Sequence, residues 1–405
     1  MPAYSGKFQY LDVGGAPLQQ GAGEISFDSE TFLVTPAAGA PLAFDLGDVD
    51  VVAPGEWELS LQLYTGRRML LRQFGPAFGR LCEELLSAWR DRTVRCLLLE
   101  DLEEIGRFRG AVNGPAAEIR IYGSNLAVLP LGGPAVQWRL ADLDSVAFHE
   151  STFTYHLLSG DRKLAIGKLA QKTGEFGETL RGAVDALRRR TAEGLHQMFP
   201  FLDAGPLQQL LVLAPEGRSV KLSALAAIHP SLPEALVARA VDQPLKPYFD
   251  SLRARAAADA VMAGFKFVRL DETAATPDAP ADAEGADAGP PLFFWFFFPL
   301  AGRDIVAWES ASRGGGATYF FRAGRPVEES IQRLTRGLAV VNFHREPVYL
   351  PDASLDQEAR FHRYAIGRRK LPELNDLRAA FLGRAIHSSL EAWEQQVAQA
   401  AGVAS

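Results

Sequence analysis

The most regular pattern in the chain is an alternation of hydrophobic and polar residues that recurs through its N-terminal half. The segment "EISFD" (residues 24–28) places apolar side chains at every second position, and "TFLVTP" (31–36) ends at a proline. The segment "WELSLQLYTGRRMLL" (57–71) alternates on both sides of Thr65-Gly66, which predicts a hairpin turn. This region is therefore expected to form short antiparallel strands.

Each run of predicted strands leads into a segment with helical spacing of its apolar residues. The expected buried positions are Phe78, Leu81, Leu85 and Trp89 in the first segment, and Phe176, Leu180, Ala183 and Leu187 in the second. Both segments end in cations, at Arg90–Arg92 and Arg188–Arg190. Cations suit a helix C-terminus, so these arginines are expected on a solvated face.

The two runs are copies of one another. At a constant offset of about 94 positions, roughly fifteen of about 49 aligned residues are identical, which is hard to obtain by chance without a gap. The matching pairs include Glu24 with Glu118, Ile25 with Ile119, Val34 with Val128, Asp48 with Asp142 and Asp50 with Asp144. The repeated aspartate pairs could suggest a metal site, but duplication of a fold explains their recurrence without any catalytic or metal-binding role.

The C-terminal half has a different composition. Residues 199–262 show helical spacing, and residues 263–405 mix short strands with helices, closing in an expected amphipathic helix or helix pair over residues 371–400. The stretch at 272–291 consists mostly of Ala, Pro, Asp and Glu, so it is expected to be a disordered acidic loop.

After this loop comes "PLFFWFFFPL" (291–300), which is too short to span a membrane. It is expected to be a strand with rings on both faces. One set of rings should fill the core, and the other should be covered by the terminal helices, a neighbouring domain or a partner. Phe294, Phe296 and Phe298 are therefore candidate interaction residues, because an exposed set would mark an interface.

About six or seven antiparallel strands closed by one helix resemble the pleckstrin-homology superfold, including its GRAM-like relatives. The resemblance covers residues 4–92 and 106–195 and rests on the order of elements. It implies an α+β protein with two tandem pleckstrin-homology-like β-barrels, at 1–105 and 106–198, each closed by a C-terminal helix. A helical region (199–262) and an α+β domain (263–405) would follow, with a degraded third copy as an alternative for the last part.

Domains that resemble this superfold bind phosphoinositide headgroups, peptides or proteins, and they are rarely catalytic. A polyphosphate headgroup needs convergent cations. The first predicted hairpin has no Lys or Arg after Lys7 in copy one, and copy two offers only Arg107, Arg109 and Arg120. The sequence therefore does not favour lipid headgroup binding.

The rest of the chain offers little that predicts chemistry. The formal charge of −7 argues against broad attraction to nucleic acid, and two cysteines indicate a reducing compartment. Without a visible leader, the expected location is the cytoplasm. His149 and His156 are the only near histidine pair, and no nucleotide or nucleophile motif occurs. We expect no enzymatic activity, metal or cofactor.

One basic cluster stands out, in "ARFHRYAIGRRK" (359–370). Cations interleaved with Phe361 and Tyr364 could grip nucleic acid or an acidic peptide. The alternatives are a solvated loop or an intramolecular partner of the acidic linker. The candidate residues of this cluster are Arg360, His362, Arg363, Arg368, Arg369 and Lys370.

These observations together predict a non-enzymatic protein- or peptide-binding scaffold. The first alternative is a protein associated with nucleic acid or chromatin, since tandem domains of this superfold also occur in histone chaperones. Phosphoinositide binding, or an enzyme with a site in the C-terminal half, is less favoured. The sequence identifies neither the partner nor the oligomeric state.

Overall fold

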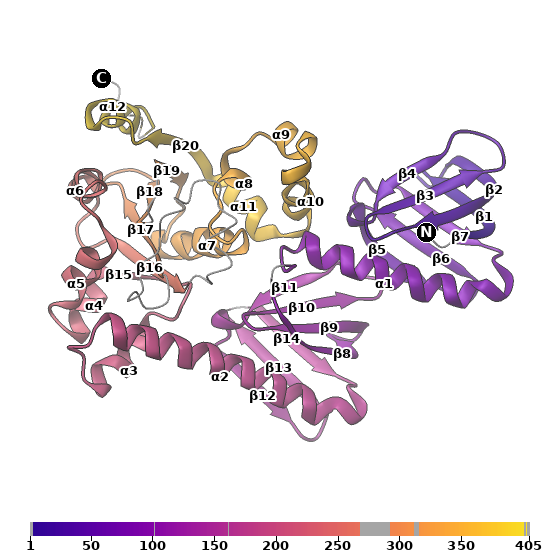
Figure 1. Ribbon diagram of the computed structural model, residues 1–405, viewed down its shortest axis with the longest axis horizontal. Helices are drawn as coiled ribbons and strands as arrows, with labels where there is room; N and C mark the ends of the chain where they lie inside the picture. The colour runs from indigo at the N-terminus through magenta and orange to yellow at the C-terminus, as the bar shows by residue number, and fades with distance from the viewer. Residues whose placement is uncertain are drawn as a thin grey trace, which may run out of the picture. The chain divides into compact units, whose positions relative to one another are not determined.

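The computed structural model describes residues 3–100, 102–160, 162–267, 292–311, 316–400 and 402 (Figure 1). The predicted acidic loop at 272–291 lies outside these residues. The chain divides into two compact units. The first unit holds residues 1–184 together with 352–372, and the second holds 185–351 together with 373–405.

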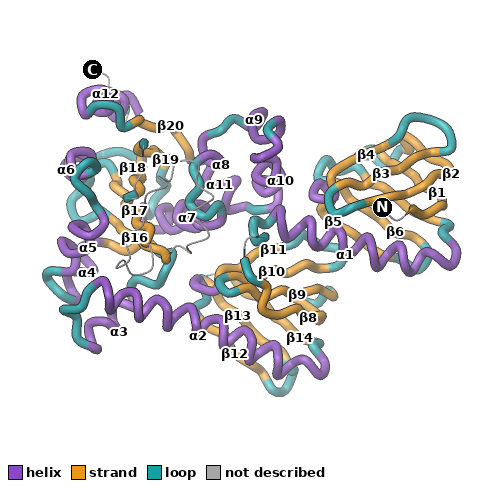
Figure 2. Tube along the Cα trace, viewed as in Figure 1, coloured by secondary structure: helices purple, strands orange, loops and turns teal. Residues whose placement is uncertain are grey.

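The first unit contains two seven-stranded antiparallel sheets with the same strand order (Figure 2). The first sheet is ordered β4-β3-β2-β1-β7-β6-β5 and the second β11-β10-β9-β8-β14-β13-β12. This shared order agrees with the duplication seen in the sequence. The strands of the first sheet are β1 (Ala3–Leu11), β2 (Pro17–Phe27), β3 (Thr31–Pro36), β4 (Leu42–Asp45), β5 (Val49–Pro54), β6 (Glu58–Leu63) and β7 (Arg68–Arg72). Those of the second are β8 (Glu104–Val112), β9 (Ala116–Tyr122), β10 (Asn125–Pro130), β11 (Val136–Arg139), β12 (Ser145–His149), β13 (Thr154–Ser159) and β14 (Arg162–Gly167).

Both sheets are open in the described residues, because the outer strands of each do not pair with one another. Each sheet is followed by a helix, α1 (Phe78–Cys96) or α2 (Thr173–Met198). The helical spacing predicted the buried positions of both helices correctly. Trp89 of α1 is fully buried, and its Nε1 donates to the carbonyl of Val49 at the start of β5 (2.9 Å). The hydrophobic effect of burying about four large side chains is the main interaction that holds α1 against the first sheet.

The second unit contains a six-stranded antiparallel sheet in the order β15-β16-β17-β18-β19-β20. Its strands follow one another in sequence, whereas the first strand of each duplicated sheet lies in the middle. The alternative of a third copy is therefore wrong for this sheet. Its strands are β15 (Ser219–Lys221), β16 (Met262–Phe267), β17 (Leu292–Pro299), β18 (Ile305–Ser310), β19 (Ala317–Arg322) and β20 (Phe381–Ile386).

Helices of the second unit cover both faces of this sheet. The predicted helical region forms α3 to α6, and the predicted closing helix pair is interrupted because residues 381–386 pair with β19 as strand β20. The described helices after α2 that belong to this unit are α3 (Ala204–Leu213), α4 (Leu222–Ile228), α5 (Leu232–Ala240), α6 (Lys246–Arg255), α7 (Val327–Val340), α8 (Glu346–Tyr349), α11 (Pro372–Ala380) and α12 (Leu390–Ala400).

The aromatic run forms β17, between β16 and β18. On one face, Phe296 and Phe298 lie 4.9 and 5.3 Å from the ring of Phe249 in α6. On the other face, Trp295 lies 4.3 Å from the ring of Phe343, just after α7, and its Nε1 donates to Ser219. The second unit itself thus covers both sets of rings.

Candidate functional site

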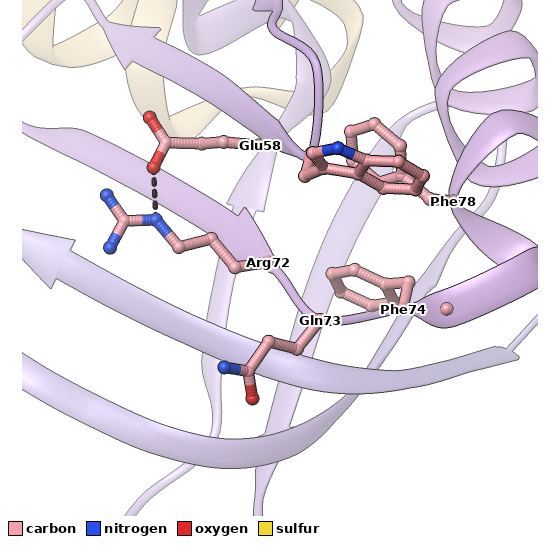
Figure 3. Close-up of a pocket in the computed structure, with 7 residues that line it drawn as sticks. Glu58, Arg72, Gln73, Phe74 and Phe78 are labelled. Atoms are coloured by element: carbon pink, nitrogen blue, oxygen red, sulfur yellow. Dashed lines mark hydrogen bonds and ion pairs between the residues drawn. The ribbon is translucent and has the colours of Figure 1, made fainter.

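An open pocket of about 470 Å³ lies at the point where β7 of the first sheet leads into α1 (Figure 3). Trp57, from the turn between β5 and β6, forms one wall, and Phe78 from the first turn of α1 faces it with a ring-centroid distance of 6.4 Å. Trp57 is 69% exposed, whereas Phe78 is 8% exposed. The lining residues are Trp57, Glu58, Arg72, Gln73, Phe74, Gly75 and Phe78.

The sharp corner between β7 and α1 shapes the floor of this pocket. Gln73 and Gly75 both have positive φ (60° and 54°), and such a conformation costs a non-glycine residue about 1 kcal/mol or more. The corner directs Phe74 inward, where its ring lies over Gly6; a Cβ on that glycine would come within 2.5 Å of the ring. Gly6 therefore allows the close approach that holds Phe74 beside the pocket.

The rim of the pocket is polar. Arg72 and Glu58 face one another across neighbouring strands and form an ion pair, drawn as a dashed line in Figure 3. The lining residues provide neither a histidine nor a thiol nor a hydroxyl. An apolar base with one ion pair at its rim suits the binding of an apolar side chain and its flanking polar groups better than proton transfer.

The second copy also displays aromatic rings in the corresponding turn. Between β12 and β13, Phe153 is 64% exposed and contacts Phe148, with ring centroids 6.4 Å apart. Phe148 contacts Tyr155, which contacts Phe176 of α2. The gapless alignment did not reveal this similarity, because an offset of about 94 pairs Trp57 with Ser151. The signal that could have found Trp57 is an aromatic residue that closely follows Pro54-Gly55, a residue pair typical of turns.

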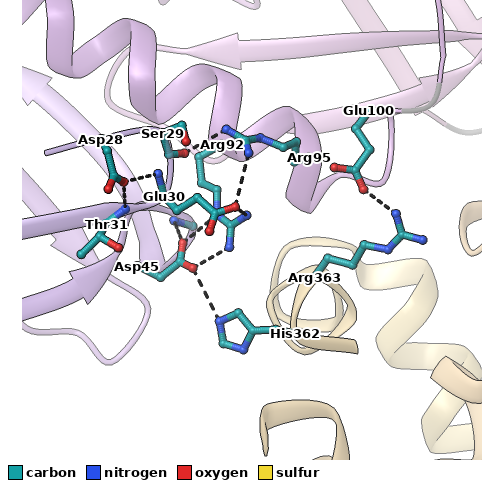
Figure 4. Close-up of polar contacts among 11 residues, drawn as sticks. Asp28, Ser29, Glu30, Thr31, Asp45, Arg92, Arg95, Glu100, His362 and Arg363 are labelled. Carbon is teal, nitrogen blue, oxygen red and sulfur yellow. Dashed lines mark hydrogen bonds and ion pairs between the residues drawn. The ribbon is translucent and has the colours of Figure 1, made fainter. Parts of the chain in front are cut away.

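The basic cluster belongs to the first unit, where it forms a short helix, α10 (His362–Lys370), after η6 (Ala359–Phe361) and α9 (Asp352–Gln357). Its side chains contact carboxylates of the same unit (Figure 4). The pairs are Arg360 with Glu358 (3.1 Å), His362 with Asp45 (3.5 Å), Arg363 with Glu100, Arg368 with Asp352 and Asp356, Arg369 with Asp48 (2.7 Å) and Lys370 with Asp50 (3.1 Å). These carboxylates thus neutralise the cations of the basic cluster that would otherwise contact a phosphate backbone.

The other candidate residues lie in the core of the second unit. Phe294, Phe296 and Phe298 are 4%, 0% and 0% exposed. They contact helices of that unit, so in this structure they offer no surface to a partner.

Arg92 forms a buried polar network instead of lying on a solvated face. It is 7% exposed, and its Nε and Nη2 donate to both oxygens of Asp45 (2.8 and 2.5 Å; Figure 4). Burial alone would raise the pKa of Asp45, but the hydrogen bonds from Arg92 and the Gly47 amide lower it below its ordinary value. Arg90 likewise pairs with buried Glu118 of the second sheet (3.2 Å). The expectation of solvated arginines at the end of the first helix is wrong, because helix spacing does not show which acids lie opposite.

A second buried network lies in the second unit. The Glu309 side chain on β18 is fully buried and accepts a hydrogen bond from Thr318 Oγ1 (2.5 Å). Its Oε2 lies 3.2 Å from His387 Nε2, and Trp393 Nε1 donates to Thr318 (3.0 Å). Burial raises the pKa of Glu309 above its ordinary value, although His387 and Thr318 act in the opposite direction. Sequence reasoning missed this group, since its members come from β18, β19, the end of β20 and α12.

The near histidine pair, His149 and His156, does meet, with ring centroids 4.5 Å apart. Within the described residues, no group of three or more His, Cys, Asp or Glu side chains is arranged to hold a metal ion. Among the described helices, none combines the length and the apolar character needed to cross a membrane.

Comparison with known proteins adds no family to this picture. No protein-family model matches the chain, and no curated protein matches it.

Proposed function

We propose that the chain is a non-enzymatic scaffold built on two pleckstrin-homology-like domains, and that the first domain binds a peptide segment of another protein at the Trp57 pocket. The observation that carries the proposal is the exposed indole of Trp57, which packs beside the ring of Phe78 and lines an open pocket of about 470 Å³. The order of seven strands followed by one helix, present twice, supports the resemblance to that superfold.

The exposure of Trp57 favours binding over a purely structural role. A tryptophan that only stabilised the fold would bury its ring, because a buried aromatic side chain contributes about 1.5–3 kcal/mol or more from its area alone. Tryptophan is also among the residues most enriched at energetically dominant positions of interfaces. Together with the neighbouring ring of Phe78, Trp57 provides an apolar surface for one apolar side chain.

The neighbouring strand favours an extended peptide as the ligand. β5 is an outer strand of the first sheet and ends three residues before Trp57. Outer strands have unpaired backbone donors and acceptors that can pair with an added strand. A bound peptide would place an apolar side chain against the exposed face of Trp57 and its polar groups near Arg72 and Glu58.

Selection of displayed random peptides on the full-length chain, followed by calorimetric titration of the selected peptides, tests the proposal. Trp57→Ala should weaken binding by about 2 kcal/mol or more, which is roughly 30-fold. Phe201→Ala is the matched control, because Phe201 is also an exposed aromatic (45%) but lies in the second unit. Failure to select any peptide, or equal effects of the two substitutions, would overturn the proposal.

A further inference from the structure

The basic helix α10 lies on one face of the first domain that we call the acidic face. This face consists of Asp45 at the end of β4, the short helix η1 (Leu46–Asp48), Asp50 of β5 and Cys96 at the end of α1. Four cationic or titratable side chains reach acids at its margin, namely His362 to Asp45, Arg363 to Glu100, Arg369 to Asp48 and Lys370 to Asp50.

The margin of this contact is polar and partly exposed. Arg369 donates to Asp48 (2.7 Å), and its guanidinium also lies 3.9 Å from the ring centroid of Tyr64. Lys370 Nζ donates both to the carbonyl of Val49 (3.0 Å) and to Asp50 (3.1 Å). Charge pairs at an interface margin direct recognition and are weakened by salt.

The centre of the contact is apolar and closely packed. Ile366 is fully buried. A Cβ at Gly47 would come within 2.9 Å of Ile366 Cδ1 and 2.7 Å of Cys96 Sγ, and a Cβ at Gly367 would lie 3.1 Å from the Cys96 carbonyl oxygen. The two glycines therefore let the helix approach the domain closely. An apolar centre with a charged margin is the usual anatomy of a protein–protein interface.

The second copy uses its equivalent acids differently. At the position of Asp45 it has Arg139, which pairs with Asp142 (3.7 Å), the counterpart of Asp48. Asp144, the counterpart of Asp50, accepts a hydrogen bond from the Gly160 amide (2.6 Å). The duplicated acids thus have partners inside the second domain, whereas in the first domain they reach the basic helix. The fold alone does not require this helix.

The first domain also builds its core without α10. The described core cluster of the domain is formed by residues between Tyr4 and Trp89. Moreover, α10 has only nine residues, and isolated helices shorter than about 12–15 residues are marginal in water. The helix therefore depends on the acidic face far more than the domain depends on the helix.

We propose that the acidic face is a recognition surface for a basic helix of a partner protein, and that α10 occupies it in cis as a competitor. The partner helix would carry an isoleucine-glycine pair at its centre and consecutive cations after it, as in "IGRRK" (366–370). Release of α10 exposes the face without opening the sheet. This surface does not include the Trp57 pocket, so Trp57→Ala should leave it unchanged.

A labelled peptide of residues 359–371 tests the proposal by fluorescence anisotropy with the full-length chain. In the variant Arg369→Asp/Lys370→Asp, the weakened cis helix should let the peptide bind, and the wild type should bind it at least about tenfold more weakly because the tethered helix competes. Arg360→Asp is the matched control, because Arg360 pairs with Glu358 beside it. It should behave as wild type.

Two outcomes would overturn the proposal. Equal binding to the wild type and to the double variant would place the peptide elsewhere, and binding to neither would show that the face does not recognise such a helix. A peptide with Ile366→Asp should not bind, and its binding at the affinity of the parent peptide would also contradict the proposal.

Cys96 provides a second measurement that does not depend on the peptide signal. In a Cys82→Ser background, maleimide should label Cys96 faster in the double variant than in the wild type, and added peptide should slow the labelling again. Restored protection would show that the domain of the variant is folded. Labelling that is equally slow in both proteins would mean that the helix stays in place, against the proposal.

Discussion

Lys370 donates a hydrogen bond to the backbone carbonyl of Val49, which lies 321 positions earlier in the chain. The same carbonyl accepts the Nε1 hydrogen of Trp89 from α1 (2.9 Å). One acceptor at the start of β5 therefore holds both the helix that follows the first sheet and the segment that arrives from the C-terminal half.

The buried Arg92–Asp45 pair should make the first unit sensitive to acid. Asp45→Asn removes the closer of the two carboxylates that pair with Arg92, the other being Glu30 (3.2 Å), and breaking a buried pair in this way costs up to about 3–5 kcal/mol. Because the pKa of Asp45 is lower in the folded state, its contribution is present above the unfolded pKa and is lost as pH falls through the folded pKa.

Urea unfolding of wild type and Asp45→Asn at several pH values measures this effect. The difference in free energy of unfolding should be largest near neutrality and should shrink in acid. A difference that did not change with pH would show that the lost hydrogen-bond geometry, and not the charge, accounts for the cost.

Glu309 should have the opposite pH dependence. Its folded pKa is raised by burial, so the stability it contributes is present below the unfolded pKa and is lost as pH rises through the folded pKa. Glu309→Gln keeps the shape of the side chain and removes the ionisation. The variant should therefore gain stability relative to wild type as pH increases.

Thermal unfolding of Glu309→Gln and of the control Glu329→Gln across a pH series measures this gain. Glu329 lies exposed on α7, so its substitution should give a nearly flat profile. If Glu309→Gln lost stability relative to wild type with rising pH, the ionised carboxylate would stabilise the fold through its contact with His387, and burial would not be the dominant effect.

The aromatic strand should depend on a glycine in its neighbour. Gly264 of β16 pairs with Trp295, and a Cβ at this position would come within 2.3 Å of the indole. Gly264→Ala should therefore destabilise the second unit by about 1–3 kcal/mol, as overpacking does in other cores.

A double-mutant cycle with Trp295→Leu identifies the cause. The cost of Gly264→Ala should fall when the indole is removed, because the two groups compete for one space. Gly182→Ala is the control; it lies in α2 with open space around it, so it should be neutral or stabilising by up to about 1 kcal/mol. Equal costs in both backgrounds would rule out steric overlap with Trp295.

Local patterns in the sequence predicted much of this fold. The alternation around Thr65-Gly66 marked β6 and β7, the helical spacing marked the buried side of α1, and the gapless duplication marked two sheets of equal strand order. These features depend on neighbours within a few residues or on comparison of the chain with itself, and both are visible without a structure.

The contacts that define the candidate sites were not predictable in this way. The sequence shows Arg92 only as a cation near a helix end, and it does not show that Asp45 lies opposite. In the same way, it does not show that Arg369 pairs with Asp48. The spacing of apolar residues predicted a helix at residues 381–386. These residues form strand β20 instead, because pairing with β19 outweighs the local pattern. Trp57 was overlooked because the duplication aligns it with a serine.

The path of the chain has a consequence for the order of events during synthesis. Lys370 follows Val49 by 321 residues, so at roughly 5–20 residues per second the ribosome needs roughly 15–60 s to make the helix that covers the acidic face. Once Trp89 has been made, a nascent first domain has its complete core for the rest of this interval but no α10 on its surface. Each newly made molecule thus passes through a period in which this face is open to other proteins.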